Sequence, residues 1–248
     1  MTRRSHAQDA ATKAELAPTG TLRVGLVEAP SAGLIFVSRA ADGRLDGVTT
    51  DLSADLARYV DLLPAVTLFP NLGGAATALQ AAAIDVSFMP IDATRRQVID
   101  FGPTYYDLES TYLASAGSGI TDVARVDRTG LRVVAIEDTT TFRAATRTLT
   151  RTQLIPVPSV AEAVARMRAG QADAFALSRD TLRPVVAQIP VSRIVAGGFQ
   201  HMQVAVAVPK GRPAALACVT AWLDGAKRTG AVRRIFDARG FRDDAVAP

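Results

Sequence analysis

The sequence predicts an α/β protein with two similar lobes, each a mostly parallel sheet flanked by helices. The first observation is a regular alternation of short apolar strands with amphipathic helices, which favours parallel sheets with right-handed crossovers. The second is that this alternation occurs twice, and both halves begin with nearly the same stretch, LRVGLVE at 22–28 and LRVVAIE at 131–137. The third is the size, because 248 residues of which 48% are hydrophobic suffice for two lobes of about 100 residues each.

The first half follows the order strand, helix, strand, helix, strand. Residues 22–28 are short, apolar and β-branched, which predicts a buried strand. Residues 49–63 carry apolar residues at helical spacing, with Thr50 as the expected cap, and predict an amphipathic helix. The other elements expected here are a strand at 65–69, a helix of small residues at 73–83 and a strand at 84–89.

The second half repeats this order. Ser159 and Glu162 form a capping box that predicts the start of a helix. Asp85 and Asp173 stand at matching positions beside the last strand of each half. The elements expected are strands at 131–137, 153–158 and 172–178, with helices at 139–149 and 159–170.

The chain is expected to pass between the lobes twice. One strand and two helices after residue 201 cannot enclose a core of their own, so they should return to the first lobe. Such a double connection makes a hinge, on which two lobes can close around a ligand in the cleft between them. We therefore expect a loose leader at 1–20, a first lobe at 21–108 and 199–248, and a second lobe at 109–198.

Composition excludes several classes of protein. The net charge is only +4, no block of like charge occurs and aromatic residues are sparse, which argues against nucleic acid as a partner. Cys218 is the only cysteine and is expected to be a buried, inert thiol, so an internal disulfide and a multi-cysteine metal site are excluded. His6 and His201 lie in unrelated stretches and make no zinc pair. We expect no metal, no cofactor and a monomer.

The N-terminal stretch bears on localisation. No apolar run is long enough to span a membrane. Residues 1–20 contain arginines but no apolar core, so they are not an intact signal peptide. The chain is expected to be either a mature or truncated form of an exported protein, or a cytoplasmic protein.

Ligands of open parallel sheets bind beyond the carboxyl ends of the strands. In this chain that rule selects polar residues from both halves. Arg95 and Arg96 are expected on a short helical turn capped by Asp92, where adjacent side chains point about 100° apart and only one faces a cleft. Arginine suits a carboxylate because its fork donates two parallel hydrogen bonds. A surface ion pair between Asp92 and Arg95 is the alternative.

Three consecutive threonines, 139–141, begin a predicted helix of the second half. The free N–H groups and the dipole at a helix start favour an anion there. The alternative, which is compatible with binding, is that Thr139 or Thr140 caps its own helix.

An ordered series of stretches resembles the bacterial extracellular solute-binding proteins of family 3, the polar amino acid receptors of ABC importers. The stretches are TLRVGL, GVTTDLSADLA, AIDVSF, TRRQVIDFGPTYY, LRVVAIEDTT and RAGQADAFA, and they span about residues 20–240. The resemblance implies a two-lobed type II periplasmic-binding-protein fold with the ligand cleft between the lobes. It also implies periplasmic localisation and an ABC permease as a possible partner.

The resemblance also implies positions for the ligand site. Arg95, six residues before Phe101, corresponds to the arginine that binds the substrate carboxylate, and the anion site of the second lobe falls on Asp138, Thr139 and Thr140. Leu72 and the segment 87–90 are implied to line the wall of the first lobe. The ligand-binding residues that we expect are Arg95, Thr140, Thr139, Leu72, Pro90, Ser87, Met89, Ser178, Glu28 and Asp180.

The sequence departs from the family pattern at several positions, among them Asp138, which replaces the usual glycine of the anion site. Pro90 stands where the family has a hydroxyl, and Ser178 stands where an acidic residue usually takes the α-ammonium of the ligand. An aromatic residue that often follows the first strand is replaced within EAPSAG, 28–33. An organic acid without an α-amine is therefore an alternative ligand. The candidate carboxylates to replace Ser178 in this role are Glu28, Glu137, Glu109 and Asp180.

The resulting hypothesis is a receptor that binds a small carboxylate-bearing solute, an amino acid or a related organic acid, and feeds an ABC-type importer. No phosphate-binding glycine loop and no nucleophile elbow is present, so no catalytic residue is expected. Two alternatives stay open, an enzyme on the same scaffold that resembles cyclohexadienyl dehydratase, and a ligand-sensing receptor domain.

Overall fold

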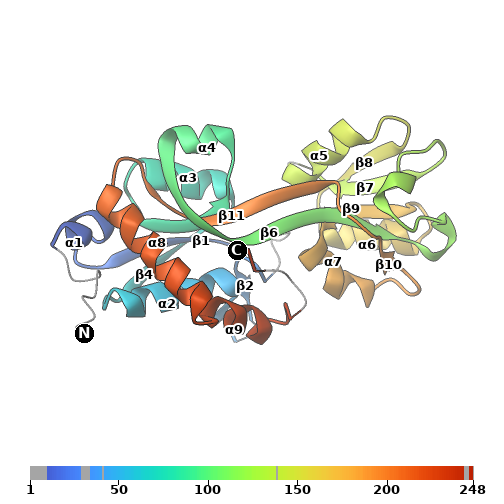
Figure 1. Ribbon diagram of the computed structural model, residues 1–248. Coiled ribbons are helices and arrows are strands. Elements are labelled where there is room, and N and C mark those ends of the chain that lie inside the picture. Colours follow the sequence, from blue (N-terminus) through green and yellow to red (C-terminus); the bar gives the residue numbers. More distant parts are fainter. Residues whose placement is uncertain (1–9, 29–33, 41, 138, 243–245, 248) are drawn as a thin grey trace. The chain divides into compact units, whose positions relative to one another are not determined.

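The computed structural model describes residues 10–28, 34–40, 42–137, 139–242 and 246–247 (Figure 1). The chain divides into two compact units. Unit 1 contains Met1–Asp107 and Gln203–Pro248, and unit 2 contains Leu108–Met202. Two long strands, β6 (Ile99–Ala114) and β11 (Gln200–Pro209), each have residues in both units, so the chain passes from one unit to the other twice.

Unit 1 contains a mostly parallel sheet. Its strand order is β4 (Pro64–Phe69), β1 (Leu22–Val27), β5 (Val86–Pro90) and β11. The pairs β1–β4 and β1–β5 are parallel, whereas β11 runs antiparallel to β5. A short antiparallel hairpin, β2 (Ser38–Arg39) with β3 (Leu45–Asp46), follows β1 along the chain.

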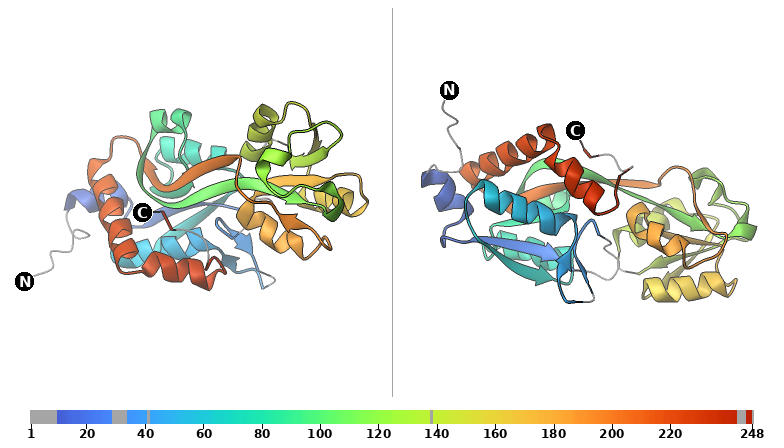
Figure 2. Two further views of the ribbon diagram at one scale, coloured as in Figure 1. Left: turned by 45° about the vertical axis from the view of Figure 1, so that its right-hand side comes forward. Right: turned by 90° about the horizontal axis from the view of Figure 1, so that it is seen from below.

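Helices pack on this sheet through apolar stripes. The helices of unit 1 are α1 (Ala10–Leu16), α2 (Val48–Tyr59), α3 (Leu72–Gln80), α4 (Ala93–Val98), α8 (Pro213–Arg228) and α9 (Ala231–Ala238). Helices α2, α8 and α9 lie side by side (Figure 2). Leu52, Leu56 and Trp222 are at most 2% exposed because the helical period places them on the inner face. Cys218 is buried on the same face of α8, and burial raises the pKa of its thiol to about 11, as expected for an inert thiol.

Unit 2 repeats the pattern. Strand β7 (Arg132–Ile136) is parallel to β8 (Gln153–Val157) and to β9 (Ala174–Ser178), and β9 is antiparallel to β6. The short strand β10 (Arg193–Ile194) pairs with β6. The helices are α5 (Thr140–Thr148), α6 (Val160–Arg168) and α7 (Arg179–Val186), and two 3₁₀ turns, Ala116–Ser118 and Val123–Arg125, complete the unit. The α/β class predicted from the alternation is confirmed.

The similarity of the two units extends to an arginine–aspartate pair with the same hydrogen bonds. In unit 1 the guanidinium of Arg23 donates to both carboxylate oxygens of Asp85, and the backbone N–H of Asp85 donates to the carbonyl of Arg23. In unit 2 Arg132 and Asp173 make the same contacts. Arg23 and Arg132 lie on β1 and β7, and their aspartates directly precede β5 and β9. The matching aspartates of the two halves therefore connect neighbouring parallel strands in each unit.

Residues 10–16 correct the prediction of a loose leader, because they form helix α1 (Ala10–Leu16). Residues 1–9 lie outside the described part of the chain. Leu16 is 1% exposed, and the carboxylate of Glu15 accepts hydrogen bonds from the backbone N–H groups of Ala214 and Ala215 at 2.7 and 3.1 Å. Glu15 thus satisfies free N–H groups at the start of α8, where no side chain of α8 itself acts as a cap.

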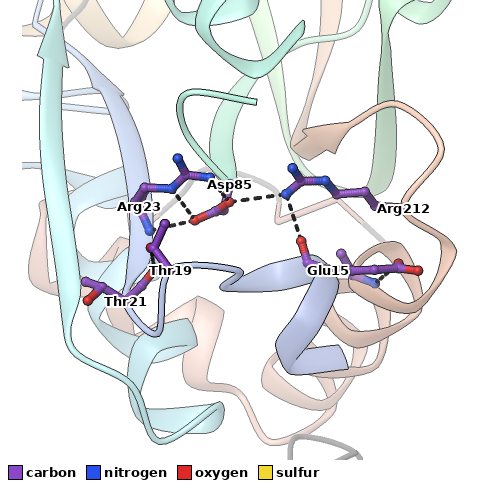
Figure 3. Close-up of polar contacts among 7 residues, drawn as sticks. Glu15, Thr19, Thr21, Arg23, Asp85 and Arg212 are labelled. Carbon is purple, nitrogen blue, oxygen red and sulfur yellow. Dashed lines mark hydrogen bonds and ion pairs between the residues drawn. The ribbon is translucent and has the colours of Figure 1, made fainter. Parts of the chain in front are cut away.

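Arg212 completes this attachment. Its Nη1 donates to the carbonyl of Glu15 at 2.8 Å and to Oδ1 of Asp85 at 3.2 Å. Figure 3 shows Arg23 and Arg212 reaching Asp85 from opposite sides. The side chain of Asp85 is 0% exposed, so the two arginines compensate a fully buried carboxylate.

The start of α2 is a second correction. The predicted cap, Thr50, lies inside the helix, which begins at Val48 after Gly47. The backbone of Gly47 has φ of 148°, and a Cβ atom there would lie 1.8 Å from the carbonyl oxygen of Phe36. The backbone of Val48 also donates to the carbonyl of Leu34. The close approach of the preceding chain, rather than a hydroxyl cap, therefore sets where α2 begins.

Candidate functional site

Arg95 lies on α4, directly after the carboxyl end of β5. The carboxylate of Asp92 accepts the backbone N–H of Arg95 at 2.8 Å, which caps the helix as predicted. The guanidinium donates from Nη1 to the carbonyl of Pro90 at 2.8 Å, and its Nε lies 3.2 Å from Oδ2 of Asp92. The Arg95 side chain is only 16% exposed. The ion pair considered as the alternative is thus present, and it holds the guanidinium at the strand end.

Arg96 has different surroundings. Its side chain is exposed, and its Cζ lies 5.8 Å from the centroid of the Phe101 ring. Its backbone carbonyl accepts a hydrogen bond from Nζ of Lys210 at 2.9 Å. The two adjacent arginines therefore differ as turn geometry predicts, with one drawn back toward the sheet and the other at the surface.

Asp100 fixes the end of this segment, a role that the sequence did not reveal. Its carboxylate lies 2.8 Å from Nζ of Lys210 and accepts the backbone N–H of Gly211 at 2.9 Å. Partial burial by itself raises the pKa of Asp100, but the hydrogen bonds from Lys210 and Gly211 lower it below its usual value overall. The segment that carries Arg95 is therefore attached at both ends, to β5 and to the turn before α8.

The other predicted residues of β5 face into unit 1. Ser87 is 0% exposed and donates its hydroxyl to the carbonyl of Gly25 at 2.8 Å, and Met89 is also 0% exposed. These two side chains have no surface on which a ligand could lie, so we do not carry them into the proposed site. Pro90 is buried as well, and its carbonyl orients Arg95. Leu72 is half-buried and begins α3, after the cap Asn71.

Glu28 follows β1 and is neutralised within unit 1. Both oxygens of its carboxylate accept hydrogen bonds from Arg39 on β2, at 3.1 and 2.9 Å. Arg39 was not expected near the site because eleven residues separate it from Glu28 and no periodic pattern connects them. The segment 29–33, where an aromatic residue was expected to be replaced, lies outside the described residues.

In unit 2 the predicted anion site lies at the start of α5. Thr139 caps this helix by accepting the N–H of Phe142 at 3.0 Å, and its hydroxyl donates to the carbonyl of Ile136 at 2.7 Å. The capping alternative is therefore present. Thr140 is the first residue of the helix and is half-buried. Asp138, which was implied to belong to the same site, lies outside the described residues.

A cluster of hydroxyl and amide groups adjoins this helix start, and sequence reasoning missed it. The Ser110 hydroxyl lies 3.1 Å from the hydroxyl of Thr141 and donates to Oε1 of Gln200 at 3.2 Å. Ser110 also pairs with Ser178 in the β6–β9 register. These residues come from distant parts of the chain, so only the strand pairing of the folded unit brings them together.

The remaining predicted residues of unit 2 lie on or near α7. The Ser178 hydroxyl is 2.9 Å from that of Thr181, and Ser178 is 7% exposed. Asp180 is 5% exposed. Glu109, one of the candidates to bind an ammonium group, forms an ion pair with Arg179.

The described residues at these strand ends combine paired charges with hydrogen-bond donors. Glu28 and Glu109 are each neutralised by an arginine of their own unit, whereas helix N–H groups and hydroxyls gather at the start of α5. Across the described residues, no three His, Cys, Asp or Glu side chains gather in a way that would hold a metal ion. The side chains and helix N–H groups described here can form hydrogen bonds and ion pairs.

Comparison with known proteins gives consistent results. A search of curated proteins found no significant match. Among solved structures, an ancestral amino acid-binding protein described as a precursor of cyclohexadienyl dehydratase is 25% identical and has a TM-score of 0.72, with 90% of this chain and 97% of that chain covered. A binding component of an ABC transporter from Wolinella succinogenes, complexed with lysine, is 22% identical with a TM-score of 0.75, covering 89% and 95%.

A third solved structure, a mutant of the arginine-binding protein ArgBP of T. maritima, is 22% identical with a TM-score of 0.71 and covers 92% of this chain and 98% of that chain. These similarities agree with the fold predicted from the sequence, that of two-lobed type II periplasmic binding proteins. The family model of bacterial extracellular solute-binding proteins, family 3, matches residues 27–238, which is most of the sequence. The chain therefore belongs to the bacterial extracellular solute-binding proteins of family 3.

Proposed function

We propose that this protein binds a small solute that carries a carboxylate, an amino acid or a related organic acid, and delivers it to an ABC-type importer. Membership of the family supports binding of an extracellular solute. The similar structures support the ligand class, since their descriptions name amino acid binding and a bound lysine. The hydrogen-bond donors at the strand ends agree with a carboxylate.

The observation that carries this proposal is the position of Arg95. Its guanidinium is held at the carboxyl end of β5 by Pro90 and Asp92 and is mostly buried. An arginine oriented in advance loses little side-chain entropy on binding, and partial burial strengthens its attraction to a carboxylate.

Unit 2 is proposed to supply the second group of contacts. Thr140 and the first N–H groups of α5 would donate to the bound anion, while Thr139 keeps its capping bonds. Ser178 is proposed to lie near the ligand without providing a negative charge. An amino acid, whose α-ammonium needs an acidic partner, would then be bound less well than a related organic acid that has no α-ammonium.

A thermal-shift screen tests this function. The panel pairs each amino acid with its 2-hydroxy acid, so that every pair differs only at the α-ammonium position. We expect at least one carboxylate compound to raise the melting temperature, because a ligand that binds the folded state stabilises it by mass action. Failure of every compound in both series to shift the melting temperature would contradict the proposal.

Location and partner follow from the same reasoning. In the part of the chain that the structure describes, no helix is both long and apolar enough to cross a membrane. The family is one of extracellular solute-binding proteins. We infer that the protein acts outside the cytoplasmic membrane, in the periplasm, and that an ABC permease receives its ligand.

An enzyme on the same scaffold is the second candidate. The observation that favours it is the 25% identity to an ancestral protein described as a precursor of cyclohexadienyl dehydratase. Such activity would need a carboxyl group that can exchange a proton, and Glu28 and Glu109 are both held by arginines. Product formation from a cyclohexadienyl acid, measured for the wild type and for Glu28→Gln and Glu109→Gln, distinguishes this candidate from simple binding.

A further inference from the structure

Strand β4 exposes apolar side chains at the outer end of the unit 1 sheet. It pairs with β1 on one side, and no strand of the described residues pairs with its other side. Leu63, Val66 and Tyr59 are 82%, 42% and 39% exposed, and they are three of the five large hydrophobic side chains that the described residues expose. Pro64, Ala65 and Thr67 between them are also exposed. We call residues 63–67 the β4 edge surface.

The sequence that contains β4 and follows it carries no charge. Residues 62–84 contain no Asp, Glu, Lys, Arg or His, although 21% of the residues of the chain are charged. Edge strands of stable monomers usually carry charged residues or are covered, because an open edge can pair with another strand. An open strand edge with contiguous exposed apolar side chains and no charge is instead a feature of interaction surfaces.

The backbone of β4 has hydrogen-bonding groups on its open side. The carbonyls of Leu63 and Phe69 point to β1, since they accept the N–H groups of Leu22 and Glu28. Backbone groups alternate in direction along a strand, so those of Val66 and Leu68 point away from β1. The carbonyl of Pro64 also points to the open side. Proline has no N–H, but an N–H at this position would point away from β1, so the pairing with β1 loses no hydrogen bond.

We propose that two copies of this protein associate through their β4 edge surfaces, with the two β4 strands antiparallel and Val66 opposite Val66 of the second copy. In this register the two Val66 residues exchange N–H···O bonds, and the N–H of each Leu68 donates to the carbonyl of Pro64 in the other copy. Exposed Leu63 flanks the paired strands and loses its contact with water.

Charge explains why a second copy is the partner. A two-fold interface brings the same surface of both molecules together, so any charge on it faces an equal charge. Residues 62–84 carry no charged side chain, so two copies of this surface bring no like charges together. The monomer expected from the sequence is thus replaced by a dimer in this proposal.

Association is measured by sedimentation equilibrium and by size-exclusion chromatography with light scattering. We expect the wild type to show a concentration-dependent dimer. Val66→Lys places two like charges opposite each other and should weaken dimerisation by about tenfold or more, with an unchanged melting temperature. The matched control is Val191→Lys, because Val191 of unit 2 is an isolated valine that is 81% exposed; it should dimerise like the wild type.

Disulfide trapping tests the register. Val66→Cys should cross-link two copies under mild oxidation, whereas Val191→Cys should not, and native Cys218 is buried and does not interfere. A wild type that stays monomeric at every concentration would overturn the proposal. Equal dimerisation of the wild type and Val66→Lys, or cross-linking of Val191→Cys as readily as Val66→Cys, would also overturn it.

Discussion

Arg95 and Arg96 are neighbours in sequence but differ in surroundings, because adjacent helical residues point about 100° apart. The contacts of Arg95 with Asp92 and with Pro90 span three and five residues, so they are local enough to follow from the sequence. The ion pairs Glu28–Arg39 and Glu109–Arg179 join residues eleven and seventy positions apart. No pattern in the sequence indicates these longer contacts, so the pairing of both carboxylates with arginines could be found only in the folded chain.

Two buried tyrosines offer a test at the scale of single atoms. Among the described residues, the hydroxyl of Tyr105 has no hydrogen-bond partner although the residue is 0% exposed. Tyr112 is equally buried, but its hydroxyl shares a hydrogen bond with that of Thr148; burial is the main effect on it and raises its pKa to about 12. Removing an unpaired buried hydroxyl relieves a desolvation penalty, whereas removing a paired one leaves its partner unsatisfied.

Tyr105→Phe should therefore leave the free energy of unfolding unchanged or raise it. Tyr112→Phe, the matched control, should lower it by about 1 kcal/mol. Both values come from urea denaturation followed by circular dichroism. An equal loss in the two variants would show that the Tyr105 hydroxyl contributes a hydrogen bond to the folded state.

At the scale of elements, the repeated strands and helices were predictable because each carries its own periodic pattern. Helix α1 was not, because AATKAEL shows no apolar stripe and only Leu16 and Thr12 are buried. Its attachment depends on Glu15 meeting the start of α8, 199 residues away, and on Arg212. Such contacts are encoded in single side chains rather than in a repeating pattern, so the leader was predicted as loose.

The matching pairs Arg23–Asp85 and Arg132–Asp173 allow the two units to be compared directly. Asp85 is 0% exposed and contacts two arginines, whereas Asp173 is 22% exposed and contacts one. Loss of a charge from a buried network leaves its partners uncompensated, and the cost falls as water reaches the group.

We expect Asp85→Asn to lower the free energy of unfolding by about 3 kcal/mol and Asp173→Asn by about 1 kcal/mol. Chemical denaturation at neutral pH measures both. Equal losses would contradict this prediction, because burial and the second arginine would then add nothing to the contribution of Asp85 to the free energy of unfolding.

At the scale of the whole molecule, the family and the division into two units connect the local features to function. Residues 27–238 match the family model, and each unit presents its candidate ligand groups at the carboxyl ends of its own parallel strands. The family pattern was recognisable in the sequence because its stretches occur in order. The uncharged segment that contains β4 can also be recognised in the sequence. Only the folded sheet shows that β4 is an edge strand and that this segment forms an exposed surface.

The central claim is that Arg95, and not its neighbour, binds the carboxylate of the ligand. Isothermal titration calorimetry of Arg95→Ala and Arg96→Ala, with a compound identified in the thermal-shift screen, tests it most directly. Arg95→Ala should weaken binding by about a hundredfold or more, because a charge-assisted contact in a mostly buried position is lost. Arg96→Ala should bind within a few-fold of the wild type. Equal losses in the two variants, or unchanged binding by Arg95→Ala, would contradict the account.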